Sequence, residues 1–68
     1  MAKRKTRIQQ AEIVQHFAAK LRELRHSSGL TQAELAREAK VTTTYIWRLE
    51  GGAVAPGIDL VDRLAKAL

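Results

Sequence analysis

Residues 29–51 read GLTQAELAREAKVTTTYIWRLEG, and this stretch decides the fold. Thr31 and Glu34 stand three residues apart, the spacing of a capping box, in which each side chain accepts a hydrogen bond from the backbone amide of the other residue. The box predicts a helix over residues 32–39. Thr42 supplies a second N-cap, and a glycine pair ends the helix that follows it. The sequence therefore predicts two short helices joined by a tight turn.

The flanking sequence predicts one further helix on each side. Apolar residues recur at helical spacing in a first helix from about Ile8 or Gln9 to His26 (Ile13, Val14, Phe17, Ala18, Leu21 and Leu24) and in a last helix after Gly57 (Ile58, Leu60, Val61, Leu64, Ala65, Ala67 and Leu68). Strand signals are almost absent, since aromatic residues make up only 4% of the chain. We expect an all-α fold, a compact four-helix domain over residues 9–68, with a fifth helix in a longer form.

The basic charge is concentrated at the N-terminus. The net charge is +5, and residues 1–7 contribute +4 of it through Lys3, Arg4, Lys5 and Arg7, with no acid among them. We predict that residues 1–8 form a flexible, disordered basic arm that meets a polyanion, most simply nucleic acid. The alternative is a frayed, solvated terminus.

A helical wheel for residues 43–50 gives two separate faces. At about 100° per residue, Tyr45, Ile46 and Leu49 lie together on a face that fits the core. Thr43, Thr44, Trp47 and Arg48 lie on the other face, where tryptophan is an unusual residue for mere solvation. In a DNA major groove Thr44 can contact a base edge or a thymine methyl group, and Arg48 can bind guanine O6 and N7. A phosphate contact by Arg48 remains the alternative.

From Phe17 to Leu68 the sequence resembles the helix-turn-helix family of phage repressors and Cro proteins, the Xre-type regulators. The pattern is carried by residues 21–25, 29–36, 41–51 and 64–68 and by Pro56. The resemblance implies a lambda-repressor-like fold in which residues 43–50 form the recognition helix. It also implies that Thr43, Thr44 and Arg48 read bases.

Contacts to the DNA backbone are expected from several other residues. The resemblance assigns phosphate anchoring to Thr31 and Gln32, and a helix N-terminus presents free amides and partial positive charge to an anion. Of the two, we expect Gln32 to contact phosphate and Thr31 mainly to cap its helix. Trp47, Lys40, Lys3, Arg4, Lys5 and Arg7 complete the expected backbone contacts. The resemblance further implies a structural salt bridge between Arg25 and Glu50.

Two positions depart from the family pattern. Lys40 stands in the turn where the family commonly has glycine, and a left-handed backbone there costs a non-glycine residue roughly 1 kcal/mol. The loop over residues 51–55, Gly-Gly-Ala-Val-Ala, lacks the basic or polar side chains with which the family holds phosphates. Val54 in this loop either fills the core or meets a partner.

We expect the protein to bind double-stranded DNA sequence-specifically, as a homodimer, and to act as a transcriptional repressor rather than an activator. The alternative is a protein-interaction module of the same fold, such as an antitoxin or a regulatory subunit. The apolar loop and the apolar last helix favour this alternative.

Enzymatic, metal-binding and membrane roles find no support in the sequence. No set of catalytic residues can be assembled, and neither a cofactor nor a small-molecule ligand is indicated. His16 and His26 lie ten residues apart on one helix, so about 15 Å separates them and they cannot share a metal ion. No apolar run approaches the length of about 20 residues that crosses a membrane, and we expect a cytoplasmic protein, associated with the nucleoid when bound to DNA.

Overall fold

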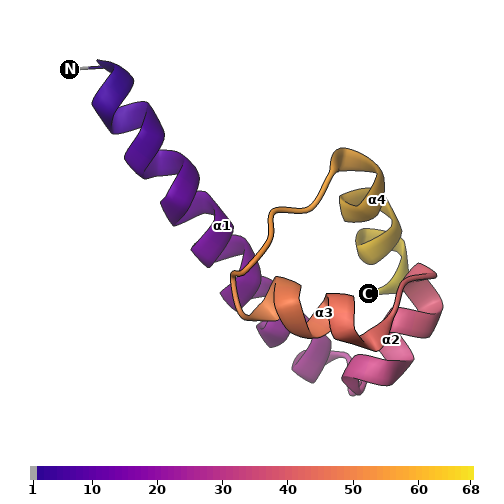
Figure 1. The fold of residues 1–68 in the computed structure, drawn as a ribbon. Coiled ribbons are helices and arrows are strands. Elements are labelled where there is room, and N and C mark those ends of the chain that lie inside the picture. The colour runs from indigo at the N-terminus through magenta and orange to yellow at the C-terminus, as the bar shows by residue number, and fades with distance from the viewer. Residues whose placement is uncertain (1) are drawn as a thin grey trace.

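The computed structural model describes the backbone of residues 2–68 and the side chains of residues 12–68. It contains four helices, α1 (Ala2–Ser27), α2 (Gln32–Ala39), α3 (Thr43–Glu50) and α4 (Ile58–Ala67), and residues 2–68 contain no strand. In Figure 1, α3 lies against the C-terminal half of α1, and α2 packs against both α3 and α4. The all-α, four-helix fold predicted from the sequence is confirmed.

The first helix begins earlier than the apolar pattern indicated. The structure assigns α1 from Ala2, whereas the sequence predicted a start at Ile8 or Gln9. The side chains of the predicted arm, Lys3, Arg4, Lys5 and Arg7, lie outside the described residues. The flexibility of residues 1–8 and their contact with a polyanion therefore stay predictions.

Local side-chain hydrogen bonds set the starts of α2 and α3. The Glu34 amide donates to Thr31 Oγ1 (3.0 Å), and the Thr31 amide donates to Glu34 Oε1 (2.8 Å), which completes the predicted capping box. The Tyr45 amide donates to Thr42 Oγ1 (3.1 Å), so α3 also has its predicted cap. Both helices begin and end at the predicted residues.

The turn between α2 and α3 contains a residue in the left-handed backbone conformation, at the position where the family commonly has glycine. Lys40 has φ 61° and ψ 46°, and it is the one non-glycine residue with positive φ in the described backbone. In this conformation the Val41 amide donates to the carbonyl of Ala36 (2.9 Å) and closes the end of α2. A strained lysine therefore holds the angle between the two helices.

The core lies where α2 packs against α3 and α4, and α1 packs against α3. Its buried residues are Leu21, Leu35, Ala36, Ala39, Ile46, Leu49, Leu60 and Leu64. Phe17, Leu30, Val41, Tyr45, Val54, Ala67 and Leu68 are partly buried against it. Val54 thus packs on the core, which was the first of its two predicted roles.

Four large residues of the predicted apolar stripes, and the small Ala65, are exposed and do not reach the core. Ile13 and Leu24 are 63% and 43% exposed, because α1 packs through the neighbouring face that contains Ala18, Leu21 and Arg25. Ile58 is 91% exposed and Val61 is also exposed, because α4 turns Leu60 and Leu64 inward. The predicted helical periodicity was right, but the buried face of α1 and of α4 is rotated around the helix relative to the predicted apolar face.

No helix in residues 2–68 is both long enough and apolar enough to cross a membrane.

Candidate nucleic-acid interface

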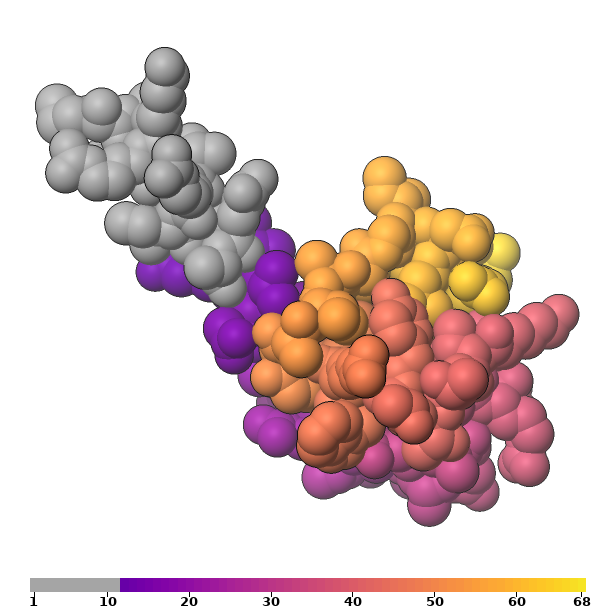
Figure 2. Space-filling model, viewed as in Figure 1, coloured from indigo at the N-terminus to yellow at the C-terminus, as the bar shows by residue number. Residues whose placement is uncertain are grey.

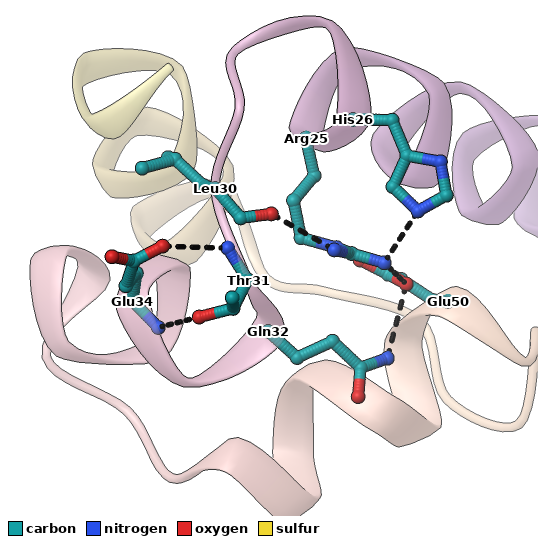
Figure 3. Close-up of polar contacts among 7 residues, drawn as sticks. All are labelled: Arg25, His26, Leu30, Thr31, Gln32, Glu34 and Glu50. Carbon is teal, nitrogen blue, oxygen red and sulfur yellow. Dashed lines mark hydrogen bonds and ion pairs between the residues drawn. The ribbon is translucent and has the colours of Figure 1, made fainter.

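A buried ion pair holds the C-terminal end of α3 against α1. Arg25 Nε donates to Glu50 Oε2 (2.6 Å), and Arg25 Nη2 donates to Glu50 Oε1 (3.0 Å). Arg25 Nη1 also donates to the carbonyl of Leu30 (2.9 Å), and Gln32 Nε2 donates to Glu50 Oε1 (3.1 Å). Figure 3 shows the Arg25 and Gln32 side chains meeting at the Glu50 carboxylate, with Arg25 also reaching the Leu30 carbonyl. The network joins α1, the turn after it, the start of α2 and the end of α3.

Both partners of the pair remain charged in the folded protein. Arg25 and Glu50 are only 8% and 7% exposed. Burial acts to raise the pKa of Glu50, but the hydrogen bonds from Arg25 and Gln32 and the charge of Arg25 outweigh it and leave this pKa below its ordinary value. The hydrogen bond to Glu50 raises the pKa of Arg25. A charged, two-point contact of this kind holds α1 and α3 in one relative orientation.

The two residues predicted to anchor phosphate at the start of α2 have structural partners. Thr31 takes part in the capping box, and the Gln32 side chain is half-buried in its hydrogen bond to Glu50. The hydrogen bonds from the Thr31 amide and hydroxyl hold the pKa of Glu34 below its ordinary value, so a negative charge sits at this helix end. Phosphate anchoring by Gln32 would therefore compete with its bond to Glu50.

The exposed face of α3 carries the residues predicted to read DNA. Thr43, Thr44 and Arg48 are exposed, and Trp47 is 65% exposed. Ile46 and Leu49, on the opposite face, are completely buried. The two faces given by the helical wheel are confirmed. In the space-filling view α3 and the loop that follows it share one face of the globule (Figure 2).

Part of this face is hollowed into a cleft of about 420 Å³ between α1, α2 and α3. Its lining consists of Arg22, Arg25, Gln32, Trp47, Arg48, Glu50, Gly51 and Ala53. The structure thus brings together Gln32, Trp47, Arg48 and the buried ion pair. Thr43 and Thr44 do not line the cleft, and Lys40 lines a separate hollow beside Arg63 and Lys66.

Sequence reasoning missed Arg22 as a member of this site. Arg22 precedes Arg25 by three residues, a spacing that places two side chains on neighbouring parts of one helix face. Once Arg25 had been paired with Glu50, this spacing could have indicated that Arg22 also lies beside the end of α3.

Charge in the cleft is available to a ligand. Among the side chains of residues 12–68, the ion pairs are Lys20–Glu23, Arg25–Glu50, Arg63–Asp59 and Lys66–Asp62. Arg22 and Arg48 take part in none of these pairs. The same is true of Arg37 and Lys40, which lie away from the cleft. The arrangement presents unpaired cations next to a helix whose exposed face is polar.

Two short, capped helices in this order, with the second offering an exposed polar face, form the helix-turn-helix arrangement. A family model described as a helix-turn-helix domain matches residues 16–68. The chain belongs to the helix-turn-helix family.

An uncharacterized HTH-type transcriptional regulator of Methanothermobacter thermautotrophicus is similar to this helix-turn-helix domain. The two are 46% identical over 48 residues, which amount to 71% of this chain and 70% of the relative. No solved structure shows significant similarity to the chain.

Proposed function

We propose that this helix-turn-helix domain binds double-stranded DNA sequence-specifically and regulates transcription, with α3 in the major groove. The observation that carries the proposal is the division of α3, whose inner residues Ile46 and Leu49 are fully buried while its outer face is polar and exposed. Membership of the helix-turn-helix family and the description of the relative as a transcriptional regulator support it.

Each exposed residue has a proposed part in this interface. Thr43 and Thr44, at the N-terminal end of α3, lie where a recognition helix reaches base edges. Arg48, one helical turn after Thr44, contacts either a base or a phosphate. Trp47, Lys40, the start of α2 at Thr31 and Gln32, and the basic residues Lys3, Arg4, Lys5 and Arg7 contact the backbone.

We propose that the domain acts as a homodimer and as a repressor. A two-fold dimer presents two recognition helices to a palindromic site, which multiplies the affinity of one short helix. A helix-turn-helix domain seated in the major groove can repress by excluding other proteins from the same DNA. Activation would require a further surface dedicated to the transcription machinery.

A protein partner is the second candidate function, and the exposed apolar side chains favour it. Leu24 of α1 and Val61 of α4 are exposed, and with Phe17 and Leu68 they line an apolar groove of about 170 Å³. A protein-interaction module of the same fold would use this groove. The groove lies outside the proposed DNA contacts, so the two functions can coexist in one molecule.

Selection of bound sequences from random duplex DNA, by the full chain and by Thr44→Ala, tests the proposed function. We expect the full chain to enrich a defined motif, and the variant to lose preference at one position at a cost of about 1–3 kcal/mol. Unchanged thermal melting would show that the variant is folded. Failure of the folded wild-type chain to bind duplex DNA, together with capture of a protein by the apolar groove, would favour the second candidate.

A further inference from the structure

Arg22 and Arg48 reach the same cleft from two different helices, α1 and α3. The charged groups that line the cleft are three guanidinium groups, those of Arg22, Arg25 and Arg48, and the carboxylate of Glu50. Glu50 is fully engaged by Arg25 and Gln32, so its charge is compensated within the protein. The lining therefore keeps two positive charges for a ligand, and both belong to exposed side chains.

The remaining lining groups narrow the chemical class of this ligand. Trp47 contributes a largely exposed indole, a flat apolar surface that water does not favour. Gly51, at the end of α3, has no side chain to obstruct the opening. Two guanidinium groups bind the oxygen atoms of phosphate with paired hydrogen bonds, and an indole packs against an adjoining sugar. An anion that carries an apolar ring beside it fits the cleft better than a bare ion does.

The position of Arg48 also bears on how α3 reads DNA. Thr43 and Thr44 lie on the exposed face but outside the cleft, whereas Arg48 shares the cleft with Arg22 of α1. Arg48 is thus grouped with the charged residues of the cleft and not with Thr43 and Thr44.

We propose that the cleft binds one phosphodiester of the DNA backbone, held between Arg22 and Arg48, with the Trp47 indole against the neighbouring deoxyribose. Arg48 is then a backbone contact, and base reading rests on Thr43 and Thr44. The proposal depends on the DNA binding proposed above and adds to it a new contact, Arg22, and a choice between the two roles of Arg48. Because the Arg25–Glu50 pair fixes α1 against α3, the contact of Arg22 sets how α3 sits along the groove.

The test compares Arg22→Gln and Arg48→Gln with Arg37→Gln on the full chain. Arg37→Gln makes the same change in net charge as the cleft variants. Arg37 is an exposed arginine without an ion pair among the described side chains, and it lies outside the cleft. Affinity for duplex DNA is measured between 50 and 200 mM salt, on a selected site and on random sequence, with thermal melting as a check of folding.

Each cleft variant should flatten the slope of log affinity against log salt by up to about 0.9. The ratio of wild-type affinity to variant affinity should therefore fall about 3.5-fold between 50 and 200 mM salt. Selected and random DNA should be affected alike, and base preference should not change. An altered base preference for Arg48→Gln would overturn the assignment of Arg48 to the backbone. Equal slopes for Arg22→Gln and Arg37→Gln would overturn the cleft as a phosphate site. Absence of DNA binding by wild type would instead overturn the proposed function itself.

Discussion

The α2–α3 unit and the α4 region are stabilised in different ways. Thr31 and Thr42 cap α2 and α3 with side-chain hydrogen bonds, and the Arg25–Glu50 pair holds the end of α3 against α1. By contrast, Gly57 stands at the N-cap of α4 without a side-chain hydrogen bond, and Ile58, the first residue of α4, is almost completely exposed. Polar contacts specify the first unit, whereas apolar packing positions the second, through buried Leu60 and Leu64 and partly buried Ala67 and Leu68.

The α2–α3 unit therefore has more directional contacts than α4 does. The elements that carry the proposed interface have fixed ends and a fixed relative orientation, as a base-reading helix requires. The helix that carries exposed apolar residues is held with less specificity.

Removal of one partner of the buried pair should have the largest effect. Arg25→Ala or Glu50→Ala leaves an uncompensated buried charge, a loss of about 3–5 kcal/mol. A chain of this size holds roughly 3–5 kcal/mol of net stability, so each variant should be largely unfolded at 25 °C by circular dichroism. The paired replacement Arg25→Met with Glu50→Leu should recover part of the loss, because no lone charge remains. Single losses below 1 kcal/mol would mean that the pair does not hold the two helices together.

Acid should weaken the α2–α3 unit before it weakens α4. The pKa values of Glu34 and Glu50 are lowered in the folded state, below the ordinary 4.5. Their contribution to the free energy of unfolding is therefore complete above that value and is lost as the pH falls through the lower folded-state pKa values. Urea melts between pH 7 and pH 3 should show stability falling below about pH 4.5. Glu34→Gln, which can keep the capping box, should reduce this pH dependence, and the exposed control Glu38→Gln should leave it unchanged.

The sequence predicted the α2–α3 unit well because its signals are local. Thr31, Glu34 and Thr42 bond to amides within three residues, so the bounds of α2 and α3 follow from the chain itself. The helical periodicity of α1 and α4 was also visible. Which side of each helix faces inward depends on the other helices, and Ile13, Leu24, Ile58 and Val61 were placed in the core wrongly for this reason.

The candidate site was predictable in part. The exposed face of α3 followed from the wheel, since burial on one helix is periodic. The bond between Gln32 and Glu50 could not be deduced, because it depends on how the start of α2 meets the end of α3. The place of Arg22 in the cleft follows from its spacing to Arg25 only once the Arg25–Glu50 pair is known. These contacts join residues far apart in sequence.

Capping variants should give opposite results in the two regions. Thr42→Ala removes the acceptor for the Tyr45 amide and should cost about 1 kcal/mol. Gly57→Ser should add a few tenths of a kcal/mol, because Gly57 has the extended N-cap conformation and a Cβ there has no heavy atom within 4 Å. Urea melts of both variants at pH 7 measure the difference. A loss of stability in Gly57→Ser would mean that contacts other than a side-chain cap already stabilise the start of α4.

Another small effect is expected at the strained turn, where stability and the proposed function should separate. Lys40→Gly relieves a left-handed residue by about 1–2 kcal/mol but gives the unfolded chain more freedom, so the net gain should be about 0.5 kcal/mol. Lys40→Ala removes the same charge without relieving the turn and should not gain stability. If Lys40 contacts the DNA backbone, both variants should flatten the salt dependence of binding equally, by up to about 0.9 in slope. Equal stability of the two variants would mean that the left-handed turn stores no strain, and unchanged slopes would remove Lys40 from the interface.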